Sequence, residues 1–576
     1  MSKKIPYGIS NFESIMLENY IYVDKTPFVE MLENEPAKYT FLIRPRKFGK
    51  SLFLSMLWNY YDIVQKDNFE QLFGNLYIGK HPTGKQNSMF VLHFSFAGID
   101  TSNENDFKTS FNRSIEASVR NFCAHYKTYI NPEEYSKLNL KFIDELGTIG
   151  VSSVDIAFDI AKRSACKIYI IIDEYDHYAN DLIAIGKRLS NEQYKNAIWA
   201  NGVVRDFYET LKDATQTIID KIFITGVTPI MLDDITSGFN ISNNISIKEK
   251  YNEILGFTKQ EVNYIIEQAG VNKDDINIDT EYFYDGYLFH PDSKNKLYNS
   301  AMINYYLGCV LDEGKNVRYL IDDNLKTDYG RIRNLLNKPS NIDKLNEVIL
   351  NGYINAQLNP KFSIDFIHDE NNFPSMLYFL GLLTLGRNKD GYETMRIPNY
   401  SVQTMYWNFI ERIFKDEVRE ALYDSSEINK ALHLLIREND PNPFMQYICD
   451  GFLSRLSNRD FIKFDEKDLK ILMLGILFQS NYYFPISEME NDGGYSDIYL
   501  KRGNRFPNTE YEWVWELKYI KEKDKGNSAL IKSKKEAALS QITRYKESVM
   551  FKDRTDVRYL TVIFLGSTQF EISEVK

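Results

Sequence analysis

The first half of the chain contains short, largely apolar runs, each followed by a polar or glycine-containing turn. They cover residues 39–43, 89–96, 168–172 and 221–226. Near-continuous apolar runs are typical of strands that are covered on both faces of a parallel sheet. Residues 107–126 and 155–165 instead have apolar positions at helical spacing. The pattern predicts an α/β fold in which helices pack on a parallel sheet.

The strand expected at residues 39–43 leads into a modified P-loop, residues 44–51. Gly49, Lys50 and Ser51 fit the pattern G-x-x-x-x-G-K-[ST], whereas Arg44 stands where the first glycine is expected. Backbone N–H groups at the start of the following helix would surround the phosphates. Lys50 would reach the β/γ-phosphates, and the Ser51 hydroxyl would hold Mg²⁺. The motif therefore predicts ATP binding, and the absent glycine leaves hydrolysis open.

Two acids, Asp173 and Glu174, end the run at residues 168–172. Ligands bind at the carboxyl ends of strands in open α/β sheets. Asp173 would complete the Mg²⁺ shell, and Glu174 would act catalytically by polarising the attacking water. Each motif alone has a structural alternative, a chance Gly-Lys-Ser or a solvated acidic turn, but both in this order favour a nucleotide site. The expected nucleotide-binding residues are Arg46, Lys47, Phe48, Gly49, Lys50, Ser51, Leu52, Asp173 and Thr225.

Thr225 and Thr228 lie at the end of the run at residues 221–226. In P-loop ATPases of the additional-strand type, a polar residue at this place senses the γ-phosphate. The alternative is a threonine that caps the turn at Gly226, and both interpretations stay open. His177, just after the acidic pair, is expected to be structural.

A second candidate site lies near the C-terminus, where Asp497 begins a predicted strand and Glu516 and Lys518 lie on the next one. Alternation along a strand puts Glu516 and Lys518 on the same face. Asp497 and Glu516 would bind Mg²⁺, or Mn²⁺, through hard oxygen ligands, and Lys518 would assist the attacking water. The alternative is an exposed hairpin that carries an ion pair.

The elements around these residues favour the catalytic interpretation. A helix at residues 464–479 precedes the two strands, and a helix that contains Gln541 and a strand at residues 557–566 follow them. Strand, strand, helix and strand is the core order of the PD-(D/E)xK nuclease fold. Gln541 is predicted to position the scissile phosphate. Glu466 would either bind the metal or cap its helix, and the cap is favoured.

The chain resembles a bacterial family that joins an AAA-ATPase-like domain to a C-terminal PD-(D/E)xK nuclease domain. The resemblance spans nearly the whole chain, and its N-terminal motifs are the more specific. They are residues 5–13, 22–26, 44–52, 223–229, 255–258 and 396–399. The modified P-loop is among them, so Arg44 is expected to be a family trait. The resemblance implies an ATP-binding half and a nuclease half without defining a substrate.

Composition narrows the class of protein. A chain of 576 residues is too long for one hydrophobic core. A net charge of −11 argues against a general nucleic-acid coat protein. Four scattered cysteines without a C-x-x-C pair indicate reduced thiols in a cytoplasmic protein. No apolar run is long enough to span a bilayer, so no membrane partner is expected.

A cluster of basic residues surrounds the predicted nuclease motif. It is either a solvated face or a surface that follows a nucleic-acid backbone, most simply DNA. A homo-oligomer would be implied if an arginine acted in trans, but no particular arginine is indicated. The basic residues are Lys518, Lys521, Lys523, Lys525, Lys532, Lys534, Lys535, Arg544 and Lys546.

The motifs divide the chain into four predicted segments. Residues 1–255 form an AAA-like P-loop ATPase core, and residues 256–405 form a helical lid with a winged-helix-like element. Thr258 and Glu261 have the spacing of a capping box at the start of the lid. The aromatic cluster at residues 282–289 is expected to pack in the lid rather than to stack on bases. Residues 406–458 form a helical linker, and residues 459–576 form a restriction-endonuclease-like α/β domain.

The predicted function is an ATP-binding, ATP-hydrolysing module fused to a Mg²⁺-dependent nuclease, in which the nucleotide state controls DNA binding or cleavage. The alternative is a nucleotide-gated scaffold or sensor that binds nucleic acid or protein without cutting. The lost P-loop glycine favours the alternative for the N-terminal half. The complete set of Asp497, Glu516 and Lys518 argues against it for the C-terminal half.

Overall fold

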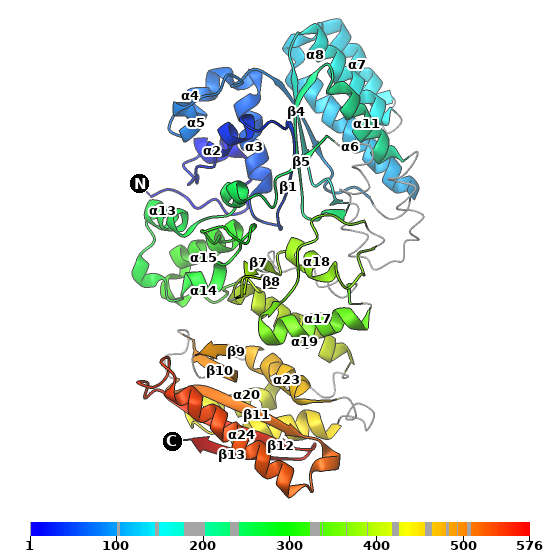
Figure 1. Ribbon diagram of the computed structural model, residues 1–576. Coiled ribbons are helices and arrows are strands. Elements are labelled where there is room, and N and C mark those ends of the chain that lie inside the picture. The colour runs from blue at the N-terminus through cyan, green and yellow to red at the C-terminus, as the bar shows by residue number, and fades with distance from the viewer. Residues whose placement is uncertain are drawn as a thin grey trace. The chain divides into compact units, whose positions relative to one another are not determined.

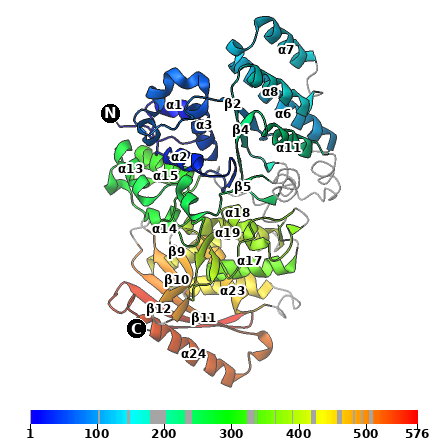
Figure 2. The ribbon, with the colours of Figure 1, turned by 45° about the horizontal axis from the view of Figure 1, so that its top comes forward.

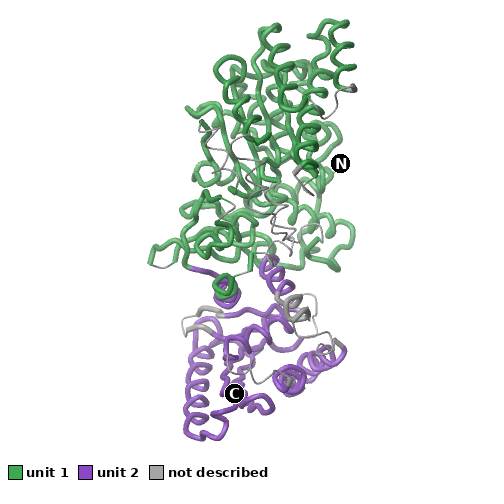
Figure 3. Tube along the Cα trace, turned by 90° about the vertical axis from the view of Figure 1, so that its right-hand side faces the viewer, with its two compact units in different colours: residues 1–343, 355–399 green, residues 344–354, 400–576 purple. Residues whose placement is uncertain are grey.

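In a computed structural model, the chain forms two compact units (Figures 1 and 3). Unit 1 comprises residues 1–343 and 355–399, and unit 2 comprises residues 344–354 and 400–576. The predicted division into four segments remains a prediction. The structure describes residues 2–100, 104–144, 149–177, 202–230, 241–322, 335–336, 338–363, 366–388, 390–417, 425–455, 464–479, 483–491, 494–503 and 509–575.

Unit 1 is built on a five-stranded sheet with the order β2-β3-β4-β1-β5, in which every described pairing is parallel. The sheet confirms the predicted α/β fold. Nearly all side chains of β3 and β4 are buried, as their apolar composition requires. The strands are β1 (Tyr39–Ile43), β2 (Phe90–Ser95), β3 (Ile168–Asp173), β4 (Ile219–Gly226) and β5 (Asn243–Asn244).

Helices cover both faces of this sheet. Figures 1 and 2 place α3 (Lys50–Tyr61) on one side and α6 (Glu104–His125), α8 (Val154–Arg163) and α11 (Val203–Ala214) on the other. The predicted helices at residues 107–126 and 155–165 are thus α6 and α8. The remaining helices before residue 255 are α1 (Phe12–Leu17), α2 (Pro27–Glu33), α4 (Phe69–Phe73), α5 (Tyr77–Lys80) and α7 (Pro132–Asp144).

The rest of unit 1 is mainly helical, and we call its residues 256–322 the lid region. Its first helix, α13 (Lys259–Ala269), begins with the predicted capping box, because Thr258 Oγ1 accepts from the Glu261 N–H and the Glu261 carboxylate accepts from the Thr258 N–H. The further elements of unit 1 are α14 (Thr280–Tyr284), α15 (Ser300–Glu313), α18 (Phe373–Phe379), β7 (Thr384–Arg387) and β8 (Glu393–Arg396). Strands β7 and β8 pair as an antiparallel hairpin.

Unit 2 contains a five-stranded mixed sheet with the order β13-β12-β11-β10-β9. Strands β11 and β12 are parallel, and α24 (Ser528–Glu547) connects them and packs on the sheet through Ile542 and Tyr545. The other strand pairs are antiparallel. The strands are β9 (Tyr483–Asn491), β10 (Gly494–Arg502), β11 (Glu512–Ile520), β12 (Val557–Leu565) and β13 (Gln569–Val575).

Helix α23 (Glu466–Gln479) precedes the sheet and packs against β9, β10 and β11. The observed order of α23, β10, β11, α24 and β12 follows the order predicted from the sequence. The other described elements of this unit are the end of α17 (Pro339–Asn351), β6 (Tyr353–Ile354), α19 (Tyr400–Glu417), α20 (Ser425–Arg437) and α21 (Asn442–Tyr447). Among the helices that the structure describes, none has the length and apolar content needed to cross a bilayer.

Gly286 in the lid region has a backbone conformation that only glycine adopts without strain. Its φ is +118°, and a Cβ atom there would lie 1.9 Å from the Pro398 carbonyl oxygen. Gly308, inside α15, has nothing within 4 Å of the corresponding position. The two glycines therefore form a matched pair for a stability test.

Gly286→Ala is expected to destabilise the protein by about 2–4 kcal/mol, because strain and steric overlap add. Gly308→Ala should instead stabilise it by about 0.5–1 kcal/mol, since alanine has the higher helix propensity. Thermal unfolding of both variants beside the wild type measures the difference. Equal midpoints for the two variants would contradict this account of the lid region.

Candidate nucleotide and nuclease sites

The P-loop joins β1 to α3 through two residues with positive φ. They are Lys47, at 67°, and Gly49, at 96°. Glycine takes this conformation without strain, which explains its place directly before the helix. Helix α3 then begins at Lys50, so Lys50 and Ser51 lie at its N-terminus beside the carboxyl end of β1. Ligand phosphates are commonly bound at this kind of helix end.

Asp173 at the end of β3 binds two hydroxyl groups. Ser51 Oγ donates to one carboxylate oxygen and Thr225 Oγ1 donates to the other, each at 2.7 Å. The Asp173 side chain is buried. Strands β1, β3 and β4 are neighbours in the sheet, which explains why residues 122 and 52 positions from Asp173 meet at one edge. The structure thus brings together three of the predicted nucleotide-site residues.

Lys50 completes this group from the P-loop. Its Nζ donates to the carbonyl oxygens of Arg44 and Pro45, at 2.9 Å each. Burial lowers the pKa of Lys50 to about 8, and the nearby carboxylate of Asp173 opposes that shift. The ammonium group is therefore held within the loop by carbonyl oxygens and lies in the field of the Asp173 carboxylate.

Thr228 has a different environment from Thr225. Its N–H and its hydroxyl both donate to Asp176, at 2.6 and 2.8 Å, and the Val227 N–H donates to the same carboxylate. Asp176 therefore fixes the turn after β4, and Thr228 belongs to that turn. Of the two candidates for a phosphate sensor, Thr225 is the one that lies against Asp173. The sequence pattern did not assign the structural role of Asp176.

Glu174 has a strained backbone, with φ at 54°, directly after β3. A hydrogen bond with His177 holds the pKa of the Glu174 carboxyl below its usual range although the side chain is partly buried, and His177 Nδ1 lies 3.5 Å from its Oε2. The Gly98 N–H donates to His177 Nε2, which places the imidazole proton on Nδ1. This geometry fits the predicted structural role of His177 and keeps Glu174 ionised. Its catalytic role stays a prediction.

Arg44, at the position of the missing glycine, is buried with only 1% of its surface exposed. Its guanidinium donates to the carbonyl oxygens of Ser246 and Tyr251, at 2.6 and 2.9 Å. The same group stacks on the ring of Phe289 in the lid region, 3.8 Å from its centre. Burial lowers the pKa of Arg44 to about 10, so the group stays charged at neutral pH. Arg44 therefore joins the P-loop to two later segments of unit 1.

Further contacts bind the lid region to the P-loop. The Gly256 N–H, the Asn299 side-chain amide and the Ser300 hydroxyl donate to the carbonyl oxygens of Phe48, Arg46 and Lys47, respectively. The Phe48 ring packs edge-on against Tyr287 and Phe289. The burial of these rings agrees with the prediction that the aromatic cluster packs inside the protein.

Restoring the consensus by Arg44→Gly is expected to destabilise the protein by at least about 3 kcal/mol, because the buried carbonyl oxygens lose a charged donor and a cavity opens. Arg46→Gly, two residues along the same loop at an exposed position, should cost less than about 1 kcal/mol. Chemical denaturation followed by circular dichroism tests both. An Arg44→Gly variant as stable as the wild type would remove the structural explanation for the arginine.

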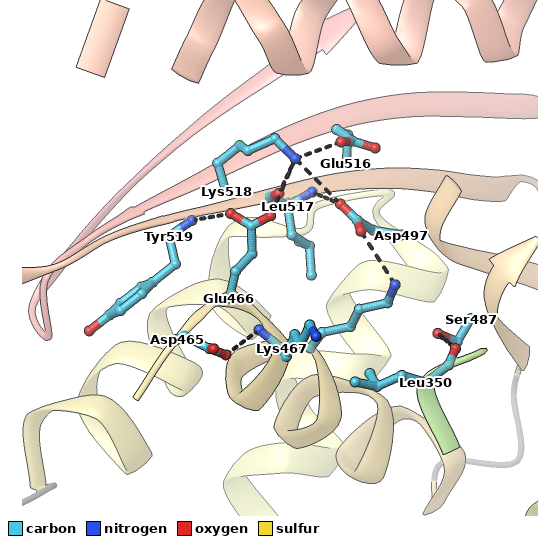
Figure 4. A network of polar contacts seen from close by, with 11 residues as sticks. Leu350, Asp465, Glu466, Lys467, Ser487, Asp497, Glu516, Leu517, Lys518 and Tyr519 are labelled. Carbon is cyan, nitrogen blue, oxygen red and sulfur yellow. Dashed lines mark hydrogen bonds and ion pairs between the residues drawn. The ribbon is translucent and has the colours of Figure 1, made fainter. Parts of the chain in front are cut away.

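The second candidate site lies where β10 separates from β11. The two strands pair at residues 498–500 and 513–515 only. Beyond that pairing, the Leu517 N–H donates to Asp497 at 2.8 Å, and the Tyr519 N–H donates to Glu466 at 3.1 Å (Figure 4). Two carboxylates thus satisfy the backbone donors that the fork leaves without a strand partner. Asp497 therefore lies in the middle of β10, which corrects the prediction that it begins the strand.

Glu466 does not cap α23, which corrects the favoured interpretation. Asp465 does so, because its carboxylate accepts from the N–H groups of Lys467 and Asp468. The Glu466 side chain instead points to β11, where it also lies 3.4 Å from Lys518 Nζ (Figure 4). The first-turn position of Glu466 misled the prediction, since a residue one place earlier was already available as a cap.

Glu516 and Lys518 lie on the same face of β11, as predicted. Lys518 Nζ is 2.7 Å from Glu516 Oε1 and 3.9 Å from Asp497 Oδ2 (Figure 4). Burial raises the pKa of Glu516 to about 7, with a further contribution from Asp497. The same two carboxylates outweigh the effect of burial on Lys518 and raise its pKa. The predicted trio is therefore one interacting cluster.

The cluster fits a divalent cation through Asp497 and Glu516. Glu516 Oε2 is buried and has no hydrogen bond of normal geometry among the described residues, although the Tyr545 hydroxyl acts on this carboxyl and lowers its pKa. A buried carboxylate oxygen with acceptor capacity left is the kind of ligand that Mg²⁺ or Mn²⁺ takes. In the part of the chain that the structure describes, no three His, Cys, Asp or Glu residues form a metal-binding group. Other ligands would have to come from backbone, water or substrate.

Sequence reasoning missed Lys470 and Tyr545, which both act on the cluster. Lys470 Nζ lies 3.3 Å from Asp497 Oδ1. A lysine within the apolar run of α23 was the signal that could have found it. Tyr545 follows Gln541 by one helical turn on α24. Gln541 itself is half-buried on that helix, and its role toward phosphate stays a prediction.

Two family descriptions match separate parts of the chain. Residues 6–236 match the AAA-ATPase-like family, described as "Predicted AAA-ATPase", and residues 464–574 match the PD-(D/E)XK nuclease superfamily. The chain thus combines an AAA-ATPase-like domain with a C-terminal domain of the PD-(D/E)XK nuclease superfamily. This confirms the resemblance and the mixed α/β fold class expected from the sequence.

One curated relative is an uncharacterized protein encoded in the vnfD 5′ region of Azotobacter chroococcum mcd 1. It is 25% identical over 295 residues, which are 50% of this chain and 48% of the relative. The match thus spans about half the length of that relative. Among solved structures, the Aeropyrum pernix ORC2 protein, in ADPNP and ADP complexes, covers 70% of this chain and 98% of its own. Its TM-score is 0.34 at 10% identity.

Glu516→Gln is expected to stabilise the metal-free protein at pH 8 by on the order of 1–3 kcal/mol. A folded-state pKa raised from 4.5 to about 7 means that ionised Glu516 opposes folding above pH 7. The gain should shrink as the pH falls from 7 and vanish below about 4.5, where both states are protonated. Urea denaturation across this pH range measures it.

Glu536→Gln is the control, because Glu536 is exposed on α24 and lies 3.9 Å from Lys532 in a surface ion pair. It should leave stability unchanged across the same pH range. A Glu516→Gln variant less stable than the wild type at pH 8 would mean that the carboxylate is retained for packing.

Proposed function

We propose that the chain is an ATP-binding and ATP-hydrolysing protein whose C-terminal domain is a metal-dependent nuclease acting on DNA. The observation that carries the nuclease half is the buried Glu516 beside the partly buried Asp497, with Lys518 between them. A carboxylate with a raised pKa, buried beside a second acid, is unfavourable for folding and is typical of a catalytic or metal site. Mg²⁺ or Mn²⁺ held by the two carboxylates would polarise the scissile phosphate.

In this proposal, Lys518 orients the attacking water, because its ammonium already bridges the two carboxylates. Asp497 is held in place by the Leu517 N–H and Glu516 by Lys518, so both would present their oxygens from fixed positions. Gln541, on α24, would contact the phosphodiester. Lysines along α24 supply positive charge for a nucleic-acid backbone, with salt-dependent affinity.

For the ATPase half, Lys50 would bind the β/γ-phosphates and Ser51 with Asp173 would hold Mg²⁺. The hydrogen bond from Ser51 to Asp173 supports this assignment, since it places both oxygens within reach of one ion. Thr225 would sense the γ-phosphate through Asp173, and Glu174 would orient water. The contacts between the lid region and the P-loop carbonyl oxygens support coupling of lid position to nucleotide.

The alternative function is a nucleotide-gated scaffold without cleavage. Arg44 favours the scaffold for the N-terminal half, because its guanidinium donates hydrogen bonds to protein carbonyl oxygens, where a phosphate would otherwise accept them. The strained, ionised Glu174 favours hydrolysis. Control of cleavage by nucleotide, the cytoplasmic location and a homo-oligomeric state remain parts of the proposal.

The deciding experiment is cleavage of linear, circular and single-stranded DNA with Mg²⁺ or Mn²⁺, with and without ATP. We expect cutting by the wild type, a loss of at least about 100-fold in Glu516→Gln and Lys518→Ala, and no loss in Glu536→Gln. Lys50→Ala should abolish the effect of ATP, with the exposed Lys66→Ala as its control. ATP binding without any cutting would favour the scaffold.

A further inference from the structure

Lys470 is a second buried lysine at the nuclease cluster. It comes from α23, its side chain is 5% exposed, and its Nζ lies 3.3 Å from Asp497 Oδ1. An ammonium group in so buried a place is unfavourable unless a carboxylate compensates for its lost hydration. The two oxygens of Asp497 therefore have different partners, because Oδ2 accepts from the Leu517 N–H.

The carboxylate oxygens of the cluster are nearly all engaged. Glu466 Oε2 accepts a hydrogen bond from the Tyr519 N–H, and Glu466 Oε1 accepts one from Lys518 Nζ. Glu516 Oε1 also accepts a hydrogen bond from Lys518 Nζ. The Glu516 Oε2 atom is the one that lacks a hydrogen bond of normal geometry among the described residues. Although the Tyr545 hydroxyl also acts on the Glu516 carboxyl, Oε2 is the carboxylate oxygen of the cluster with the most remaining acceptor capacity.

The charge of the cluster leads to the same count. With Glu516 ionised, the three carboxylates Glu466, Asp497 and Glu516 are balanced by the buried Lys470 and Lys518 and by the partly exposed Lys534, 3.9 Å from Glu466 Oε2. One divalent cation and one phosphodiester charge would leave the site at +1. A second cation would raise that to +3, and an uncompensated charge of that size is strongly unfavourable beside buried lysines.

We propose that this nuclease site takes one divalent cation, and that Lys470 supplies at Asp497 the positive charge that a second cation provides in two-metal sites. The inference rests on the proposed nuclease function. Lys470 acts through Asp497 and is therefore a positioning residue. Lys470 would hold Oδ1 of Asp497, and Glu516 together with Asp497 would hold the ion.

Calorimetric titration of the full chain with Mn²⁺, without nucleotide, tests this count directly. The number of ions at the nuclease site is the number bound by the wild type minus the number bound by Glu516→Gln. An ion at Asp173 would be bound by both proteins and so cancels in this difference. We expect one. In Lys470→Met, affinity should rise about tenfold, or a second ion should appear, because a repelling charge is removed. Lys470→Arg should keep the wild-type number and affinity.

A lysine that only packs would leave Mn²⁺ affinity unchanged or weakened in Lys470→Met. That result, or two ions in the wild type, overturns the inference while the nuclease proposal stands. Equal ion numbers in the wild type and Glu516→Gln would overturn both. Asp497→Asn supplies a double-mutant cycle, in which removing Lys470 should have a much smaller effect on affinity. If Lys470→Met fails to fold, Lys470→Gln and the wild-type count still decide.

Discussion

The buried guanidinium of Arg44 is the interaction on which the nucleotide half of the molecule depends. A guanidinium cannot be neutralised at ordinary pH, so its burial requires acceptors placed around it. Ser246, Tyr251 and the ring of Phe289 meet that requirement from segments more than 200 residues further along the chain. Arg44 therefore holds the P-loop, the strand before it and the lid region together in the folded protein. The carbonyl oxygen of Arg44 also accepts a hydrogen bond from the Lys50 ammonium group.

The nuclease half also contains charged groups that need compensating partners, but here the central groups are carboxylates and their partners are N–H donors and lysines. Asp497 and Glu466 accept from backbone N–H groups where β10 leaves β11, and the buried ammonium groups of Lys470 and Lys518 lie against Asp497 and Glu516. Each group compensates for the lost hydration of the next. Glu516 is only partly compensated, which explains why its pKa rises while that of Lys518 does not fall.

Sequence reasoning recovered what depends on local pattern. The strands before Arg44 and Asp173, the capping box at Thr258 and the shared face of Glu516 and Lys518 follow from periodicity and short motifs. Sequence reasoning failed where a contact partner lies far along the chain, or where either of two neighbouring residues could fill the same structural role. The acceptors of Arg44, the contact of Lys470 with Asp497 and the choice of Asp465 over Glu466 as a cap are tertiary facts. Periodicity carries no information about them.

The fork between β10 and β11 also determines which changes of chain length the site tolerates. Register is fixed by three residue pairs before the fork, and the acids lie within two residues of that short ladder. A slip of β10 by one residue along β11 would turn Asp497 to the opposite face, away from Glu516 and Lys518. Any change of chain length that alters this register would therefore break up the acidic cluster even where both strands still form.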